Sequence, residues 1–230
     1  MKTGIFLSYK GLGANLLHLS YCHQIAKRFG KVELITLCPN LNRVLIDDPL
    51  IKSVNYLDKF HKNFFDIINL SVFIKKFNFE NIFIFYPSIR HYLACKIAGI
   101  KNIYHYPLFK KKNLHLVNAA KTFTEQSLNI KNCPTETQIS LNNEKIKKYN
   151  LGKQKKIVLG IGSSGPTTRW GYDNFASLIN KFNDIGDYHF YLVCGKNEEE
   201  GAIKIINQIK KGNCESLSSK DVSEIIYYIY

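Results

Sequence analysis

Ile157-Val-Leu-Gly-Ile-Gly162 leads into Ser163-Ser-Gly-Pro-Thr-Thr-Arg-Trp170, and this segment decides the fold of the chain. The apolar run with glycines at its carboxyl end indicates a buried strand, and the polar stretch after it indicates a loop. From Tyr172 onward, apolar residues recur at helical spacing, with Asp173 in the first turn, where the helix dipole favours an anion. We therefore predict a strand, a loop at its carboxyl end and a helix.

The predicted loop carries groups that suit a phosphate. In open α/β sheets, ligands bind outside the carboxyl ends of the strands, where backbone N–H groups at a helix start attract anions. The side chains that add to this are those of Ser163, Ser164, Thr167, Thr168 and Arg169. We expect a diphosphate as the ligand. Local composition is equally compatible with a surface loop in which Trp170 packs on the helix and Arg169 is solvated.

The same run resembles the donor-site segment of glycosyltransferase family 9, the lipopolysaccharide heptosyltransferases. In that family a Pro-Gly-Ala/Ser loop leads into Lys-Arg-Trp-Pro and a helix containing Phe-Ala-Glu-Leu. This chain keeps the glycine, the pair Arg169-Trp170 and the helical Phe175-Ala-Ser-Leu178. It departs at Thr168, where the family has lysine, and at Gly171, where the family has proline. The first departure removes a cation that would contact the donor phosphates.

The overall composition is that of a soluble globular protein. The chain has 230 residues, of which 45% are hydrophobic and 22% charged, and no apolar run reaches the roughly 18 residues of a membrane span. The six cysteines are scattered without a Cys-x-x-Cys pair, so we expect reduced thiols and no metal site. Met1 leads into a strand-like segment rather than a signal peptide, and we expect a cytoplasmic location.

The formal net charge of +14 raises the question of a polyanionic partner. No arginine-rich helix or nucleic-acid-binding motif accompanies the charge, so we expect no nucleic-acid partner. The abundance of lysine, asparagine and isoleucine is what an AT-rich genome would encode. Loose peripheral contact with the acidic inner face of a membrane stays open as an alternative.

A second glycine-rich turn, Tyr9-Lys-Gly-Leu-Gly-Ala-Asn15, follows the first apolar strand of the chain. Gly11-x-Gly13 entering a helix is similar to a dinucleotide-binding fingerprint. However, the next predicted strand ends in Cys38-Pro39, without the acidic residue that would bind the ribose hydroxyls. The pattern therefore disfavours a nicotinamide-dependent oxidoreductase.

This turn also resembles the start of family 9 proteins, where a Gly-Asp step precedes a leucine-rich helix. The aspartate is the family's proposed general base, and the matching position here is Ala14, which cannot accept a proton. His18 lies one helical turn further on, on the same face, and is the candidate substitute. A packed or solvated histidine is the more common alternative.

The acceptor is expected at the carboxyl ends of the first domain's strands. Pro87-Ser-Ile-Arg-His91 follows the apolar strand Asn81-Ile-Phe-Ile-Phe-Tyr86, which places its polar side chains at that edge. An equal alternative for Arg90 is a structural or solvated side chain. The residues that we predict to bind the acceptor are Lys10, Gly11, Gly13, Asn15, Ser88, Arg90 and His91.

The loop Gly195-Lys-Asn-Glu-Glu-Glu200 follows the strand ending at Cys194 and resembles the family 9 loop that meets the donor's nucleoside. Glu198 or Glu199 would accept hydrogen bonds from the ribose. The alternative is that these carboxylates only complement the dipole of the following helix. The donor-binding residues that we predict are Ser163, Ser164, Thr167, Thr168, Arg169, Trp170, Gly195, Glu198 and Glu199.

Repeated alternation of strands and helices predicts an α/β chain. We expect two Rossmann-like, doubly wound units in a GT-B-like arrangement: an acceptor-side domain at 1–141, a linker at 142–154 and a partial nucleotide-sugar (donor) domain at 155–230. Family members continue through an Asp-Ser/Thr-Gly-Pro-x-His motif that this sequence lacks. The resemblance therefore implies truncation at the carboxyl end and an incomplete second unit.

The resemblance implies a glycosyltransferase. Its donor would be a nucleotide-diphosphate sugar such as ADP-heptose, used as substrate without a further cofactor. Its acceptor would be a lipid-linked lipopolysaccharide or other surface glycan, and transfer would invert the anomeric centre. The competing hypothesis is a truncated or degenerate, non-catalytic relative that retains nucleotide binding or only the fold, and Ala14 favours it.

Overall fold

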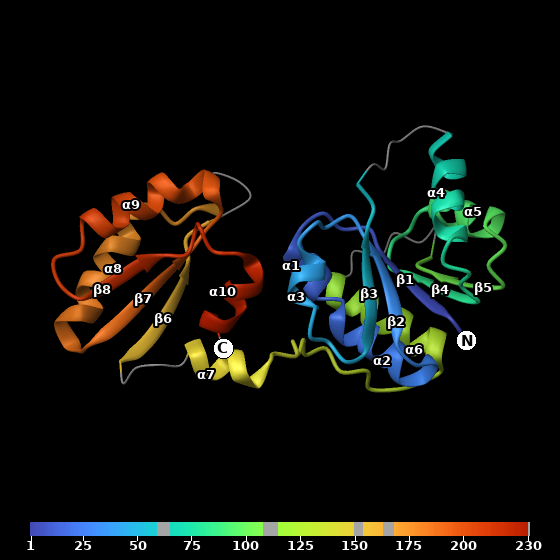
Figure 1. Cartoon of the computed structure of the whole chain (residues 1–230), viewed down its shortest axis with the longest axis horizontal. Helices are drawn as coiled ribbons and strands as arrows, with labels where there is room; N and C mark the ends of the chain where they lie inside the picture. Colours follow the sequence, from blue (N-terminus) through green and yellow to red (C-terminus); the bar gives the residue numbers. More distant parts are fainter. Residues whose placement is uncertain (59–64, 108–114, 150–153, 163–167, 230) are drawn as a thin grey trace. The chain divides into compact units, whose positions relative to one another are not determined.

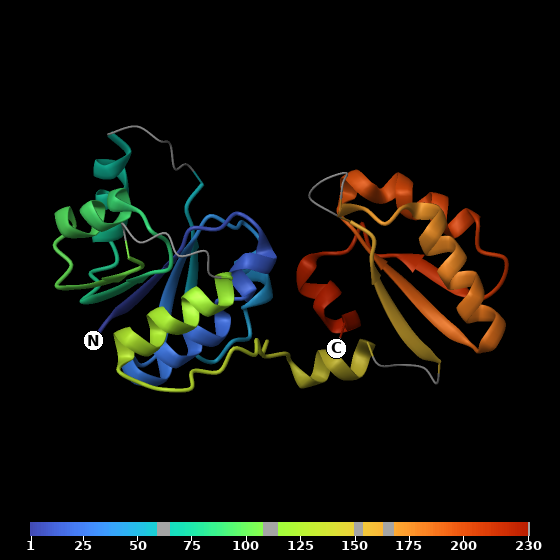
Figure 2. The ribbon, with the colours of Figure 1, turned by 180° about the vertical axis from the view of Figure 1, so that it is seen from behind.

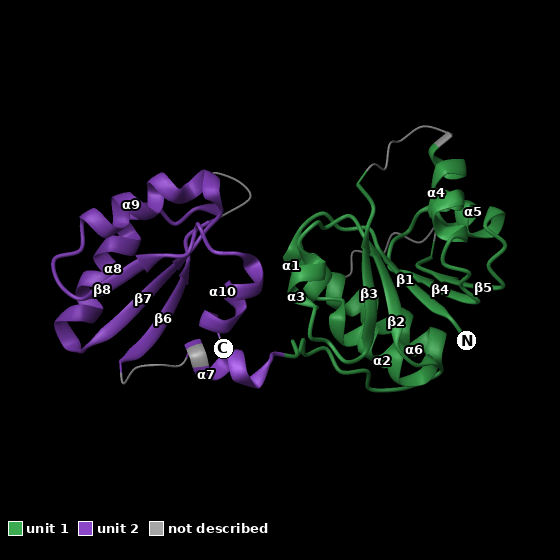
Figure 3. Ribbon diagram, viewed as in Figure 1, with its two compact units in different colours: residues 1–140 green, residues 141–230 purple. Residues whose placement is uncertain are grey.

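The computed structural model of the chain describes residues 1–58, 65–107, 115–149, 154–162 and 168–229. It divides into two compact units, unit 1 at Met1–Ser140 and unit 2 at Leu141–Tyr230 (Figure 3). Within the described ranges, each helix is too short or too polar to cross a bilayer.

Unit 1 is built on a five-stranded parallel sheet with the order β3-β2-β1-β4-β5 (Figure 1). The strands are β1 (Thr3–Leu7), β2 (Val32–Thr36), β3 (Ile51–Tyr56), β4 (Asn81–Ile84) and β5 (Asn102–His105). The order reverses between β1 and β4, so the sheet has the topological switch point of a doubly wound fold. The carboxyl ends of these strands share one edge.

Two layers of helices cover this sheet. The helices are α1 (Leu12–Leu16), α2 (Leu19–Phe29), α3 (Leu41–Val44), α4 (Phe65–Lys75), α5 (Ile89–Ile97) and α6 (Leu116–Leu128). Helices α2 and α6 pack together on one face, and α4 packs with α5 on the other (Figures 1 and 2).

Strand β4 shows why both layers form. Its residues Ile82 and Ile84 belong to the core beneath α4 and α5. The alternate residue Phe83 and the following Phe85 contact Phe123 of α6 instead, with ring centroids 6.5 Å and 5.0 Å away. All four residues are fully buried. A strand that is apolar on both faces is stable only between two layers, which is the parallel α/β arrangement.

Unit 2 has a three-stranded parallel sheet in the order β6-β7-β8. Its strands are β6 (Lys155–Gly160), β7 (Tyr188–Val193) and β8 (Asn213–Ser216), and its helices are α7 (Asn143–Tyr149), α8 (Tyr172–Ile185), α9 (Glu199–Asn207) and α10 (Val222–Ile229). Phe190 and Leu192 of β7 pack in one core with α8 and α9. Tyr191 lies on the opposite face against Tyr228 of α10.

The structure differs from the sequence-based expectation in three elements. The stretch 142–154, predicted as a linker, contains α7, whose Tyr149 stacks on Tyr227 of α10. The helix predicted after the first glycine turn is two helices, which break at Leu17 and His18. Helix α5 was not predicted, and its first turn contains Arg90 and His91. The predicted α/β class with parallel strands is confirmed.

One buried carboxylate contributes a pH-dependent part of the stability of unit 1. Glu33 in β2 is almost buried, and its Oε1 lies 3.3 Å from Nζ of Lys2 and 3.1 Å from Nζ of Lys52. Burial alone would raise the pKa of Glu33, but the hydrogen bonds and charges of the two lysines outweigh burial and lower it. The folded state therefore stabilises the ionised form of Glu33 more than the unfolded state does.

We expect Glu33→Gln to destabilise the protein at pH 7 by at most about 1 kcal/mol, because both lysines are substantially exposed to solvent. A lowered folded pKa gives stability that is present above the unfolded value, about pH 4.3, and is lost as pH falls through the folded value. Urea denaturation at a series of pH values would measure the difference. If the wild type and Glu33→Gln differed in stability by the same amount in acid as at pH 7, this account would be contradicted.

Candidate functional site

The carboxyl edge of the unit 1 sheet brings together segments that are distant in sequence. Ser8 and Tyr9 follow β1, and Phe85 and Tyr86 follow β4. Tyr9 Oη donates a hydrogen bond to the Phe85 carbonyl oxygen (3.0 Å), which ties the two strand ends together across the switch point. Burial, and to a lesser extent Tyr86, raises the pKa of Tyr9 to about 12, so the phenol stays protonated.

A buried amide holds the glycine turn after β1. Asn15 Nδ2 donates to the carbonyl oxygens of Tyr9 (2.9 Å) and Gly11 (2.7 Å). Its Oδ1 accepts from Thr36 Oγ1 (2.9 Å), which in turn accepts from the Cys38 amide (3.1 Å). Asn15 is only 1% exposed. The structure therefore corrects the prediction that Asn15 contacts the acceptor, because its polar atoms already bind the protein's own turn.

The glycines of this turn face open space. A Cβ added to Gly11 or Gly13 would meet no atom within 4 Å. Beside them, Lys10 lines a hollow of about 260 Å³ at the carboxyl ends of β2 and β3. The other lining residues are Leu37, Pro39, Tyr56, Leu57 and Asp58, none of which is among the predicted acceptor-binding residues. Tyr56 Oη donates to Asp58 Oδ1 (3.2 Å), so this hollow holds a cation, a phenol and a carboxylate.

His18, the candidate substitute base, lies in the core with no exposed surface. Its Nδ1 donates to the Ala14 carbonyl oxygen (2.7 Å), its Nε2 lies 3.4 Å from Tyr106 Oη, and its ring stacks on Tyr9. Burial lowers its pKa, opposed by the bond to Ala14. The imidazole is enclosed and both nitrogens face protein groups, so the structure does not support His18 as the base.

Ser88, Arg90 and His91 are brought to the same edge, but only partly as predicted. Ser88 is the N-cap of α5, where its Oγ accepts from the His91 amide (3.4 Å), and Arg90 is exposed. The side chain of His91 points inward, with Nε2 3.2 Å from Ser8 Oγ, and burial followed by the Arg90 charge lowers its pKa to about 4. Its 3% exposure corrects the prediction of a direct acceptor contact.

In unit 2, predicted donor residues from two loops meet. Arg169 Nη2 lies 3.3 Å from Glu198 Oε1, and Glu198 Oε2 accepts from the Gly195 amide (3.2 Å). Glu198 also lies against Gly162, since a Cβ there would collide with its carboxylate. Arg169 is 43% exposed and Glu198 only 14%. The carboxyl ends of β6 and β7 therefore carry one ion pair whose guanidinium stays open to solvent.

The other residues predicted to bind the donor lie in different surroundings. Trp170 is 54% exposed and packs edge-on against Phe175 of α8. Glu199 accepts from Ser218 Oγ (3.1 Å), which ties α9 to the segment after β8. Thr168 is exposed. Ser163, Ser164 and Thr167 lie outside the described residues, so their predicted role in phosphate binding stays a prediction.

The backbone conformation at Gly171 accounts for one departure from the family pattern, the glycine where the family has proline. Its φ is 101°, a backbone conformation that glycine adopts freely, whereas proline is fixed near −65°. A proline at this position would therefore need a different backbone before α8.

No group of three or more histidine, cysteine, aspartate or glutamate side chains in the described part of the chain is placed to hold a metal.

Comparisons with known proteins agree with this architecture. The model of glycosyltransferase family 9 (heptosyltransferase) matches residues 98–221, more than half of the chain. A family 9 glycosyl transferase from Veillonella parvula DSM 2008 has 17% identity and a TM-score of 0.77, covering 99% of this chain and 73% of that chain. No curated protein sequence gives a significant match.

Two structures from E. coli are also similar. ADP-heptose lps heptosyltransferase II has 14% identity and a TM-score of 0.77, covering 100% of this chain and 76% of that chain. Heptosyltransferase WaaC with ADP-2-deoxy-2-fluoro heptose has 14% identity and a TM-score of 0.66, covering 98% and 80%. At these identities the likeness shows the fold, with Rossmann-like units as in GT-B glycosyltransferases, and this confirms the predicted fold class.

We expect Asn15→Leu to destabilise the protein by about 2–4 kcal/mol, because it removes the amide's hydrogen bonds to the Tyr9 and Gly11 carbonyl oxygens and leaves the buried Thr36 hydroxyl without its acceptor. Thr36→Val removes the partner of Oδ1 and should cost less. In the double variant the two losses should not add, because both residues belong to one network. Chemical denaturation of the wild type and the three variants measures the coupling. Strict additivity would show that the network is not cooperative.

Proposed function

This chain belongs to glycosyltransferase family 9, and we propose that it transfers a heptose-like sugar from a nucleotide-diphosphate donor to a surface glycan such as lipopolysaccharide. The observation that carries this proposal is the family match over residues 98–221, which contain the ion pair of Arg169 and Glu198 at the carboxyl edge of unit 2.

We propose that unit 2 holds the donor. The exposed guanidinium of Arg169 stands at the carboxyl ends of parallel strands, where a diphosphate is bound in this type of sheet. Glu198 binds Arg169 and the Gly195 amide, and we propose that its carboxylate accepts hydrogen bonds from the donor's ribose. An ADP-heptose-like donor is supported by two similar proteins, an ADP-heptose heptosyltransferase and a WaaC structure with ADP-2-deoxy-2-fluoro heptose. The donor is a substrate, and no further cofactor is proposed.

The proposed chemistry is a direct displacement with inversion. An acceptor hydroxyl oxygen forms a bond to the anomeric carbon while the bond from that carbon to the diphosphate oxygen breaks. The electron pair leaves with the nucleotide diphosphate, whose developing negative charge the Arg169 guanidinium stabilises. The hydroxyl proton passes to a general base.

The position of that base is the main chemical question for this chain. Ala14 has no titratable group, and the His18 side chain is enclosed. Asp58 is an exposed carboxylate that shares the hollow beside the glycine turn with Lys10. We therefore propose that Asp58 accepts the proton and that Lys10 binds an anionic group of the acceptor.

We further propose that the acceptor is lipid-linked. The enzyme would then work in the cytoplasm with peripheral contact to the inner face of the membrane, because the lipid part of such an acceptor stays in the bilayer. The net charge of +14 is compatible with an anionic membrane face.

A second candidate is a non-catalytic relative that binds nucleotides. The observation in its favour is Ala14, together with the enclosure of His18. Calorimetric titration with ADP, UDP and NAD, followed by a transfer assay with ADP-heptose and a lipopolysaccharide acceptor, separates the candidates. Binding of ADP or UDP without transfer would favour the non-catalytic relative. Binding of NAD alone would overturn both.

We expect Arg169→Gln to weaken binding of the nucleotide diphosphate about tenfold, since it removes one charge-assisted contact to a phosphate. Isothermal titration calorimetry measures the dissociation constant. Lys181→Gln is the matched control, because Lys181 is an exposed cation on α8 that loses the same charge. Equal affinities of both variants would show that Arg169 does not meet the donor.

Two substitutions test the base. If Asp58 is the base, Asp58→Asn should lower the transfer rate by about 10²–10⁴-fold, and Ala14→Asp should add little to the wild-type rate. Tyr56→Phe is the control for the Asp58 site, since it removes the hydrogen bond to Asp58 but keeps the carboxylate. A large gain in Ala14→Asp with an unchanged Asp58→Asn variant would contradict the assignment and place the lost base at Ala14.

A further inference from the structure

Helices α4 and α5 expose five large aliphatic side chains. Their exposed aliphatic side chains recur one helical turn apart, so each helix presents them along one stripe. These side chains are Ile68 (47% exposed), Val72 (55%), Ile89 (47%), Leu93 (41%) and Ile97 (58%). Both helices lie in one layer on the sheet, with their opposite sides in the core. The stripes therefore face away from the sheet.

The opposite layer shows that this exposure is specific. Helices α2 and α6 cover the other face of the same sheet, and none of their large hydrophobic side chains is exposed. Their exposed residues are polar or basic, namely Lys27, Arg28, Asn118, Thr122 and Gln126. The apolar stripes are thus a property of the α4 and α5 layer and not of every helix in unit 1.

The exposed charged side chains on these two helices have one sign. Apart from the aliphatic residues, the exposed side chains of α4 and α5 among those whose burial is described are Asn69, Lys75, Arg90 and Lys96. The single acidic residue of the two helices, Asp66, is partly buried. We call the eight exposed aliphatic and basic side chains of these helices the α4/α5 face. A face that combines aliphatic stripes with cations and exposes no carboxylate matches an anionic interface with an apolar interior.

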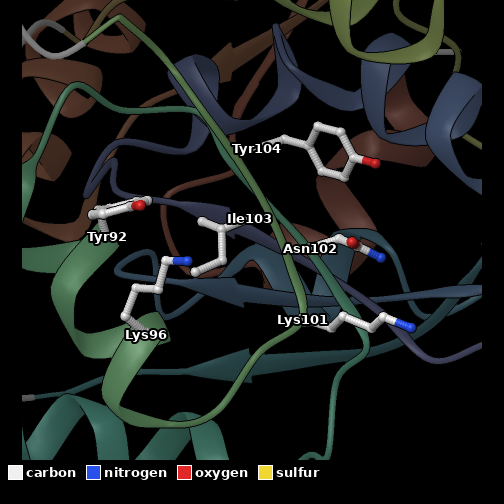
Figure 4. Close-up of a pocket in the computed structure, with 6 residues that line it drawn as sticks. All are labelled: Tyr92, Lys96, Lys101, Asn102, Ile103 and Tyr104. Atoms are coloured by element: carbon white, nitrogen blue, oxygen red, sulfur yellow. The ribbon is translucent and has the colours of Figure 1, made fainter.

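A hollow of about 270 Å³ adjoins this face where α5 meets the edge strand β5. Figure 4 shows Tyr92 and Lys96 of α5 extending toward Ile103 of β5, whereas the side chain of Lys101, which also lines the hollow, points away from these three residues. Lys96 Nζ stands 5.7 Å from the centre of the Tyr92 ring. The hollow gives the face a cationic recess of the size of a small anionic headgroup, next to Leu93 and Ile97.

We propose that the α4/α5 face docks on an anionic lipid bilayer, with the aliphatic stripes in the headgroup and acyl boundary and the cations on lipid phosphates. A second protein surface would have to supply apolar area and acidic groups together, whereas an anionic bilayer supplies both everywhere. Docking in this way needs no spanning helix.

The location of the face connects it to the acceptor. Ile89 and Arg90 begin α5 at the carboxyl edge of the sheet, directly after Ser88. The docked surface therefore reaches the edge where an acceptor would be bound. This connection rests on the proposed function, because it assumes a lipid-linked acceptor, whereas the docking itself does not.

Co-sedimentation of the full chain with vesicles tests the proposal. We expect binding to vesicles of phosphatidylglycerol mixed with phosphatidylcholine, little binding to pure phosphatidylcholine, and weaker binding at high salt. The charge variant Lys75→Gln with Lys96→Gln should lower the partition coefficient about fivefold for each charge removed. The apolar variant Val72→Gln, Leu93→Gln and Ile97→Gln should lower it by about tenfold or more.

Matched controls lie in unit 2. Ile185→Gln with Ile203→Gln and Ile229→Gln removes three exposed aliphatic side chains, and Lys181→Gln with Lys204→Gln removes two exposed helical charges. Both controls should partition like the wild type. All substituted positions are exposed and glutamine is a good helix former, so the variants should fold, and circular dichroism verifies this.

Three results would overturn the proposal. The first is a wild type that does not bind the anionic vesicles. The second is binding that the α4/α5 variants and the unit 2 controls reduce equally, which would mean diffuse attraction by the net charge. The third is a dimer of the wild type that the apolar variant dissociates while vesicle binding is unchanged. Since the vesicles carry neither donor nor glycan, none of these results bears on sugar transfer.

Discussion

Strand β4 is buried on both faces, and this two-sided burial is the constraint on which unit 1 depends. Ile82 and Ile84 require the layer of α4 and α5, while Phe83 and Phe85 require α2 and α6. Parallel strands covered in this way can be connected only by crossovers, so all strands end at the same edge. The glycine turn after β1, the hollow at β2 and β3, and Ser88 after β4 are neighbours for that reason. The edge is therefore a product of core packing rather than of any contact among the polar residues themselves.

The polar residues of the edge divide into a buried set and an open set. Asn15, His18 and His91 are buried, and their hydrogen bonds to backbone and hydroxyl groups shape the strand ends. Lys10, Asp58 and Arg90 are exposed and can meet a ligand. A buried polar group without a partner is costly, so the hydrogen bonds of the first set serve the fold. Conversely, chemistry with an acceptor can only come from the second set, which is why Asp58 replaces His18 as the proposed base.

The cations of unit 2 and of the α4/α5 face differ in how they are compensated by nearby carboxylates. Arg169 is a cation beside the β6 and β7 ends, and Glu198 compensates part of its charge before a donor arrives. On unit 1 the cations of α4 and α5 have no exposed carboxylate on the same helices to compensate them. The donor site thus resembles a preorganised ion pair suited to one small anion, whereas the α4/α5 face suits an extended anionic surface. Both features are compatible with a transferase that takes a soluble donor and a lipid-linked acceptor.

The sequence by itself determined the alternation of strands and helices, the two glycine loops at strand ends, and the placement of the Arg169 loop and the Glu198 loop after two strands. These follow from local patterns, because apolar periodicity and glycine positions act over a few residues. Only the tertiary structure decided which polar residues are buried. His18 is enclosed by Tyr9 and Tyr106, which are remote from one another in the chain, and Asn15 is bound by Thr36 of the neighbouring strand. The exposed apolar surface of α4 and α5 could not be predicted from the sequence either, since an apolar helical pattern does not indicate how much of the helix the core will cover.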